Sequence, residues 1–372
     1  MTVLACLIFQ CPLWACSVPV FRYALERWPA DSYRFVVFNE GPLSSSDSDL
    51  TEQLSHIETM GYGRPPLLGQ TVDVTQDMPE ALSSLWDQDK HPPLPAIMLL
   101  PPGLDPNVQA LWEAPLNQAS VQMLLDSPVR REVVQRLTGG QTAVWLFLRS
   151  EDPNLNDQLE ADLLKQLRVM EDALKLPHEL TEDDAVYDTP MSEVDLRIEF
   201  SVIPLDPNDP NETILTTIIR QAMPDDLAQY LPAAIPIFGR GRALTVLDKT
   251  SIVPDVVEEI CHFLVEACSC QVKQLNPGID LLMPVDWDGL VTGLIGMEDI
   301  VPTLIVPVAA TTSPSTNQPN MPMIEPNAEN NLPVAVPVVT STNLERNLKL
   351  LAFFGLVILI AATLALKKGA SR

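Results

Sequence analysis

The sequence predicts an α/β protein whose clearest unit lies in residues 141–268, and three observations carry this prediction. Residues 142–148 form an uninterrupted apolar stretch, which is typical of a strand covered on both faces. A helix at 157–174 follows, with Leu or Met at every third or fourth position. Further strand and helix patterns then alternate in the order β-α-β-α-β-β-α, which is typical of α/β folds.

The remaining elements of this unit follow from the same patterns. We expect a strand at 198–205, a helix at 212–221, paired strands at 235–238 and 243–247, and a last helix at 254–267. Pro236 stands at the start of the third strand. The element order, the element lengths and this proline resemble the thioredoxin-like fold. The resemblance implies a fold and no activity.

The front half of the chain predicts a second α/β domain. Helix 18–28 is followed by strand 34–38, by a Ser/Asp-rich loop entering a short helix within 41–55, and by a buried strand at 94–100. The next helix begins with Ser127 as its cap and Pro128 in its first turn, and Gly139 and Gly140 end it. We interpret residues 16–140 as one domain, with an incomplete thioredoxin-like copy as the finer hypothesis, and residues 141–300 as the next.

The C-terminal part of the chain predicts a membrane tether. Residues 301–345 are rich in Pro, Thr and Asn and form a linker, and residues 346–372 hold an anchor and a basic tail. The stretch from Leu350 to Leu366 has no charged residue, and Lys349 and Lys367 flank it. It is apolar on every face, so it predicts one transmembrane helix that binds the membrane.

The two ends of the chain predict its orientation. Lys367, Lys368 and Arg372 follow the anchor and outnumber the two basic residues before it, which favours a cytoplasmic tail and an extracytoplasmic folded part. Residues 1–15 have the length and hydropathy of a signal peptide, and Cys16 stands where a lipoprotein is cleaved and acylated. The alternative is a buried first strand, in which case the chain is tail-anchored and faces the cytoplasm.

The net charge of −26 excludes nucleic acid as an expected partner, because binding a phosphate backbone requires Lys and Arg. The chain shows no nucleotide loop, calcium loop or nucleophile elbow, so we expect no cofactor and no metal. A protein partner is expected instead.

Three cysteines are candidates for thiol chemistry: Cys16, Cys268 and Cys270. Cys268 and Cys270 could exchange disulfides or bind a soft metal, whereas Cys261 continues a core-facing stripe of the last helix. Cys16 precedes a helix N-terminus and could be reactive, lipidated or bridged to the other two. The thioredoxin redox motif has two cysteines between the first strand and the first helix, and residues 149–152 of this chain have none.

Two polar clusters in the sequence are candidate ligand sites. Arg240 and Arg242, in a Gly-Arg-Gly-Arg stretch, are anion-binding candidates, and a hairpin turn explains the same glycines. Asp280, Asp286 and Asp288 are candidates for a cation site, but their spacing fits no calcium loop. A solvated acidic loop is the favoured interpretation.

Residues 267–287, together with the segment that begins at Cys16, are similar to an uncharacterised membrane-anchored family of bacteria in the Planctomycetes and Verrucomicrobia. This resemblance implies an exported, membrane-held protein and brings no activity. The sequence therefore predicts a non-catalytic interaction or scaffold protein. The alternative is a thiol-dependent enzyme that uses Cys16 with Cys268 and Cys270.

Overall fold

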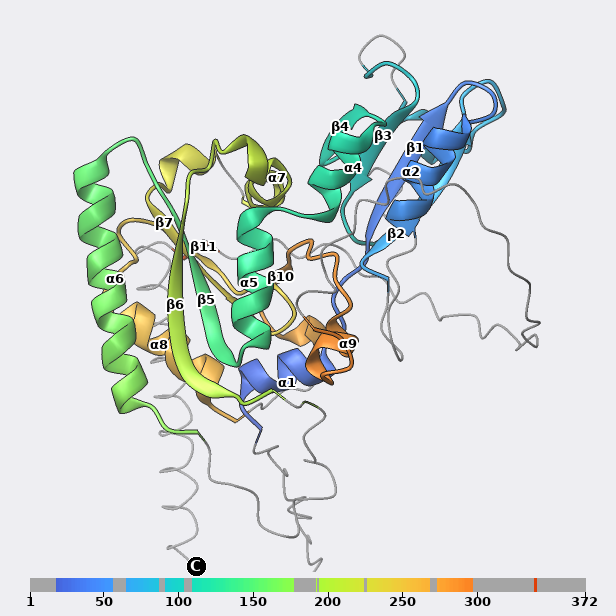
Figure 1. The fold of residues 1–372 in the computed structure, drawn as a ribbon. Helices are drawn as coiled ribbons and strands as arrows, with labels where there is room; N and C mark the ends of the chain where they lie inside the picture. Colours follow the sequence, from blue (N-terminus) through green and yellow to red (C-terminus); the bar gives the residue numbers. More distant parts are fainter. Residues whose placement is uncertain are drawn as a thin grey trace, which may run out of the picture.

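Two β-sheets, one in each half of the folded region, organise the chain (Figure 1). In this computed structural model the described residues are 18–55, 65–86, 91–103, 109–176, 192, 194–223, 226–267, 273–296 and the backbone of 338–339. The α/β class expected from the sequence is confirmed.

The first sheet contains four strands in the order β2-β1-β3-β4. They are β1 (Tyr33–Asn39), β2 (Leu67–Asp73), β3 (Ala96–Leu100) and β4 (Trp112–Pro115). β1 pairs with β2 in parallel and with β3 antiparallel, and β3 pairs with β4 antiparallel. β2 is therefore an edge strand of this sheet.

Helices cover both faces of the first sheet. The helices of this half are α1 (Val20–Arg27), α2 (Ser45–Ser55), α3 (Glu80–Ser83), α4 (Gln118–Leu125) and α5 (Pro128–Thr138). α2 and α4 share one apolar core with the side of β1 that carries Phe35. On the other side, Trp86 after α3 stacks on Phe38 with ring centroids 4.8 Å apart.

The second sheet follows the order β10-β8-β7-β5-β6, and β9 pairs with both β7 and β11. Its strands are β5 (Gln141–Leu148), β6 (Arg197–Leu205), β7 (Ala233–Phe238), β8 (Arg242–Ala243), β9 (Val246–Leu247), β10 (Ile279–Asp280) and β11 (Val338–Val339). β5 is parallel to β6, antiparallel to β7, and buried along almost its whole length. A cis peptide precedes the third strand of each half, at Leu94–Pro95 and Leu231–Pro232.

Both faces of the second sheet are also covered. The remaining α-helices are α6 (Pro153–Ala173), α7 (Thr213–Gln221), α8 (Pro254–Val265) and α9 (Trp287–Val291), and 3₁₀ turns lie at Pro210–Glu212, Leu227–Gln229 and Lys273–Leu275. α6, α8 and α1 pack on one face of the sheet, and α5 and α7 pack on the other. The α5–α7 face shares a continuous core with the first sheet, so α1 and α5 tie the halves together.

The sequence located most elements of the second half within a few residues. Three details were wrong. The expected strand at 243–247 is divided into β8 and β9, which pair with β7 at different places. α6 begins at Pro153, four residues earlier than expected, because the Asp152 side chain accepts the amides of Asn154 and Leu155. Pro236 lies inside β7, since Ala233 and Ala234 already pair with β5.

In the first half, Ser127 is the residue before α5, but its side chain makes no capping bond. Its hydroxyl instead donates to Glu212 Oε2 (2.6 Å), and Glu212 Oε1 accepts the Val129 amide (2.7 Å). The cap of α5 is therefore supplied by a distant carboxylate. No described helix is long and apolar enough to cross a membrane. The expected signal peptide, linker and anchor from Leu350 to Leu366 lie outside the described residues.

Candidate functional site

The turn between β7 and β8 holds the two arginines that the sequence singled out. Gly239 and Gly241 have φ angles of 57° and 82°, which favour glycine, so a turn explains both positions. At Gly239 a Cβ would also lie 2.6 Å from the Cβ of Ala24. The turn therefore packs directly on α1 and brings Arg240 and Arg242 into the interior, each less than a tenth exposed.

Arg242 is held by acceptors of this chain on every side. Its Nη1 donates to Asp280 Oδ1 (2.8 Å), its Nε to the carbonyl of Pro277 (3.0 Å) and its Nη2 to the carbonyl of Asn276 (2.9 Å). The guanidinium carbon lies 6.0 Å from the ring centroid of Trp28, within the range of a cation–π contact.

Lys273 is the second cation on Asp280. Its ammonium group donates to Asp280 Oδ2 (2.5 Å), to Asp31 Oδ1 (2.8 Å) and to the carbonyl of Pro29 (2.6 Å), which uses all three of its N–H groups. Asp280 Oδ2 also accepts the Asp31 amide (2.9 Å), and the Tyr33 hydroxyl donates to the Asp280 carbonyl (2.8 Å). The sequence reasoning missed Lys273, because it is the one charged residue in the stretch 267–279 and has no charged neighbour there to suggest a pair.

Arg240 forms a neighbouring pair. Its Nη2 donates to Asp288 Oδ1 (2.6 Å) and to the Glu26 carbonyl (3.3 Å), and its Nε donates to the Leu25 carbonyl (2.8 Å). Both carbonyls belong to α1. The arginine therefore connects α1 to the segment of α9.

Together, Asp31, Arg242, Lys273 and Asp280 form what we call the buried ion network. It contains two cations and two carboxylates, so its formal charge cancels. It joins the chain after α1, the β7–β8 turn and the segment that carries β10, which are far apart in sequence. Figure 1 shows α1, which precedes Asp31, side by side with α9, which follows the β10 segment. The buried charges of Arg242, Lys273 and Asp280 are tolerated because each is paired and hydrogen-bonded, whereas the side chain of Asp31 is 42% exposed at the rim.

The acidic segment of residues 280–288 is not a solvated loop, and that interpretation was wrong. Asp280 and Asp286 are buried, and Asp286 Oδ1 accepts the Gly289 amide (3.0 Å) at the start of α9. The arginine pair and the aspartates, which the sequence presented as separate clusters, are partners of each other. Anion binding at Arg240 and Arg242 stays a prediction, and an anion would have to displace Asp288 or Asp280 there.

Burial changes the titration of the network. It raises the pKa of Asp31 above its ordinary 3.8, and the charge of Asp280 adds to this rise against the opposing effect of Lys273. Burial also raises the pKa of Tyr33 well above 10, with the charge of Asp280 adding to it, so its hydroxyl stays protonated as a donor.

We expect Asp31→Asn to remove part of the pH dependence of folding. A carboxyl with a raised pKa binds more protons in the folded state, so its contribution to stability falls as pH rises through the window that begins near 3.8. Wild type should therefore lose stability relative to Asp31→Asn between acid and neutral pH. Urea unfolding at a series of pH values measures both stabilities, and a wild type that gains stability relative to Asp31→Asn as pH rises would contradict the assignment.

The cysteines are described only in part. Cys261 is fully buried in α8, where Val257 and Leu264 share its stripe, as the sequence predicted. Burial raises the pKa of its thiol to about 12, so it is protonated and inert at neutral pH. Cys16, Cys268 and Cys270 lie outside the described residues, and their roles stay predictions.

The turn between β5 and α6, where a thioredoxin carries its cysteines, is closed by its own hydrogen bonds. The buried Asn156 accepts the Ser150 amide (2.8 Å) and donates back to the Ser150 carbonyl (2.8 Å). Asp152 Oδ1 accepts the amides of Asn154 (3.0 Å) and Leu155 (3.2 Å). The polar side chains of this turn are therefore used to hold its own backbone.

A second polar cluster connects α4, α5 and α7. The buried Arg130 donates through Nη1 to the carbonyls of Leu124 (2.9 Å) and Leu282 (3.3 Å), and through Nε to Ser127 Oγ (2.9 Å). Burial lowers its pKa to about 10, which still leaves it charged at neutral pH. Neither Arg130 nor Glu212 was singled out in the sequence, since no local pattern distinguishes Arg130 from the adjacent Arg131 or connects it with Glu212.

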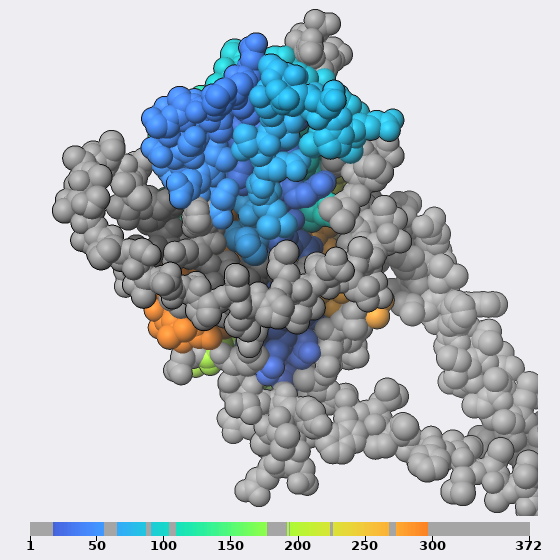
Figure 2. All heavy atoms as spheres, turned by 90° about the vertical axis from the view of Figure 1, so that its right-hand side faces the viewer, coloured from blue at the N-terminus to red at the C-terminus, as the bar shows by residue number. Residues whose placement is uncertain are grey.

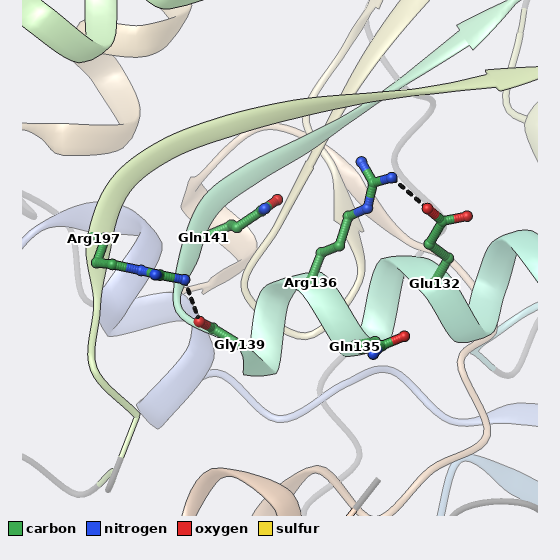
Figure 3. A pocket seen from close by; sticks show the side chains of 6 residues that line it. All are labelled: Glu132, Gln135, Arg136, Gly139, Gln141 and Arg197. Atoms are coloured by element: carbon green, nitrogen blue, oxygen red, sulfur yellow. Dashed lines mark hydrogen bonds and ion pairs between the residues drawn. The ribbon is translucent and has the colours of Figure 1, made fainter.

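A recess of about 380 Å³ lies where α5 ends and β5 begins (Figure 3). Its polar lining comprises Glu132, Gln135, Arg136, Gly139, Gln141 and Arg197. Figure 3 shows Arg197 reaching the Gly139 carbonyl (2.9 Å) and Arg136 paired with Glu132. Arg197 caps the end of α5 and Arg136 pairs along the helix, so both arginines of the recess already stabilise the fold.

Comparisons with protein families, curated proteins and solved structures found no match to this chain.

Proposed function

We propose that this chain is a membrane-tethered, extracytoplasmic interaction module, built from two tandem thioredoxin-like units and working without catalysis. The first unit spans β1 to α4 and the second spans β5 to α8. In each, strands one and two are parallel, strands three and four are antiparallel, and the sheet order is four-three-one-two.

The placement of the helices supports the same proposal. In a thioredoxin-like unit the first and last helices cover one face of the sheet and the middle helix covers the other. Here α2 and α4 lie opposite the α3 segment, and α6 and α8 lie opposite α7. The four strands of the first half support a complete first unit, where the sequence alone indicated an incomplete one.

The observation that carries the absence of catalysis is the construction of the two turns after the first strands. The turn after β5 is closed by Asn156 and Asp152 as described above. In the turn after β1, Ser44 Oγ accepts the Asp47 amide (3.2 Å) and donates to the Asp47 carboxylate (2.7 Å). Neither turn contains a cysteine in the sequence. The polar side chains at both positions cap a helix. The remaining role that we propose for the fold is to offer a surface for binding.

The tether rests on the sequence: the apolar stretch from Leu350 to Leu366, the Pro-rich linker and the basic tail. An acidic folded part on such a stalk fits a protein partner. The test is turnover: full-length protein in nanodiscs should not accelerate the reduction of insulin disulfides by dithiothreitol. Acceleration that is lost in Cys268→Ser or Cys270→Ser would overturn the proposal.

One observation favours the thiol-dependent alternative. Pro19 and Ala267 form an antiparallel bridge, and the Val20 amide donates to the Glu266 carbonyl (3.0 Å). Cys268 is the next residue after Ala267, and Cys16 stands three residues before Pro19, within about 11 Å of extended chain. The fold therefore places the segment that leads to Cys16 next to the segment that leads to Cys268. In a redox reaction, two thiols here would become a disulfide while a partner disulfide is reduced to two thiols, so two electrons and two protons pass to the partner.

Peptide mapping of the protein purified from membranes tests both readings together. We expect Cys16 to carry an acyl group or to be linked to Cys268 or Cys270, with a state that mild dithiothreitol does not change. Cys261 is the internal control and should be alkylated only after denaturation, because its thiol is buried. A Cys16 linkage that opens and re-forms with a partner disulfide would favour the enzyme, and an intact Met1 would contradict the signal peptide.

A further inference from the structure

β2 presents an unpaired edge to solvent. The Tyr33 amide donates to the Pro66 carbonyl (2.9 Å) and the Val74 amide donates to the Asn39 carbonyl (2.9 Å), so the even-numbered residues of β2 face β1. The amides and carbonyls of Gly69 and Thr71 therefore point away from the sheet. No described residue pairs with them, and residues 68–71 are exposed.

The other long edge of the protein, at β6, is blocked. The Phe200 amide donates to Glu171 Oε1 (2.7 Å), and the Val202 carbonyl accepts Arg136 Nη1 (3.2 Å). Pro204 has no amide proton to offer. Side chains and a proline at an edge are the usual protection against pairing with another chain. Residues 67–72 of β2 are uncharged and contain no proline, and the carboxylate of Asp73, which ends the strand, accepts the amides of Gly41 and Thr75.

The surroundings of β2 are acidic apart from Arg34, the residue of β1 that pairs with Leu68. The described residues from 35 to 55 and from 65 to 86 include no Lys or Arg, and they carry seven carboxylates: Glu40, Asp47, Asp49, Glu52, Asp73, Asp77 and Glu80. Figure 2 looks onto this face, where the darker blue atoms of α2 lie beside the lighter blue atoms of β2 and the segment after it. This surface favours a cation-bearing partner.

The two faces of the edge differ. α2, with its carboxylates, packs on the side of the sheet that carries Phe35 and Leu67, whereas Leu68 lies on the opposite side and is 48% exposed. Gly69 lets β2 lie directly against the ring of Phe35, because a Cβ at this position would lie 2.0 Å from that ring. An added strand would therefore have basic side chains toward α2 and apolar ones beside Leu68.

We propose that the edge of β2 binds an extended segment of a partner protein, with alternating basic and apolar residues, as a fifth strand of the first sheet. This rests on the proposed function as an interaction module and names the chemistry of its partner. The backbone groups of Gly69 and Thr71 supply the hydrogen bonds. A second copy of this chain is disfavoured as the occupant, because it would place two acidic surfaces against each other.

The probe is the peptide Lys-Val-Lys-Val-Lys-Val-Lys, added to full-length protein in nanodiscs. We expect it to bind, to slow hydrogen exchange at residues 67–73, and to bind at least tenfold more tightly than Glu-Val-Glu-Val-Glu-Val-Glu. Added salt should weaken binding. Thr71→Pro removes an outward amide and should weaken binding at least tenfold, whereas Thr71→Val keeps the amide and should bind as wild type does.

A peptide methylated on the amides of alternate residues repeats the test without changing the protein. Methylation along one edge of the peptide should abolish binding, and methylation along the other edge should not. No binding, or binding that ignores both Thr71→Pro and methylation, would overturn the proposal. Dimers of the free protein that Thr71→Pro dissociates would identify a second copy as the occupant and also overturn it. None of these results depends on turnover, so they are separate from a failure of the proposed function.

Discussion

Asp280→Ala is expected to lower the free energy of unfolding by about 3–5 kcal/mol, because it leaves two buried cations without their shared anion. Arg242 and Lys273 are both less than a tenth exposed, and both donate to the Asp280 carboxylate. Urea unfolding followed by circular dichroism measures the loss.

The control is Asp172→Ala, which removes an exposed carboxylate of α6 and should change stability by less than about 0.5 kcal/mol. A double variant sharpens the assignment. Because Lys273→Met removes one of the stranded cations, it should cost less in the Asp280→Ala background than alone. Additive losses, or a loss no larger than that of Asp172→Ala, would show that the network does not hold the segments together.

The network also shows where sequence reasoning stopped. The continuous apolar strand of residues 142–148 and the amphipathic helix after it are local patterns, and the structure has both within a few residues. The buried stripe of Val257, Cys261 and Leu264 on α8 could be predicted for the same reason, because it is a local pattern too. The pairing of Arg242 with Asp280 depends on a long-range contact, and no local period encodes it.

Secondary structure with little apolar signal was missed for a related reason. β2 is an edge strand whose residues are mostly exposed, so Leu67–Asp73 lacks the buried alternation that identifies a strand. β4 is short, and the partly exposed Trp112 and the exposed Glu113 gave no continuous pattern. The first unit was therefore predicted as incomplete, although its strand order is the same as that of the second.

Helix caps made by residues far away in the chain could not be predicted from the sequence either. Ser127 stands where a capping serine is expected, and the backbone turns there as predicted. The carboxylate of Glu212, which lies far along the chain, takes over the cap and also accepts the serine hydroxyl. Burial raises the pKa of Glu212, and the hydrogen bonds from Ser127 and Val129 act against this rise.

Arg130→Met is the second substitution with a large expected effect, a loss of about 3 kcal/mol in the free energy of unfolding. Methionine matches the length of the apolar stem but donates no hydrogen bond. The carbonyls of Met123 and Leu124 at the end of α4, and of Leu282 between β10 and α9, would then be left without this donor. The charge of Glu212 would lose its nearest cation as well.

The neighbouring Arg131→Met provides the matched control. Arg131 pairs with Asp126 at the surface with its side chain 45% exposed, so its loss should cost at most about 1 kcal/mol. Because Arg130 links α4 to the second unit, we also expect Arg130→Met to speed hydrogen exchange in residues 118–125 more than in β5. Equal losses for the two variants, or exchange that rises evenly across both sheets, would mean that Arg130 does not fasten the first unit to the second.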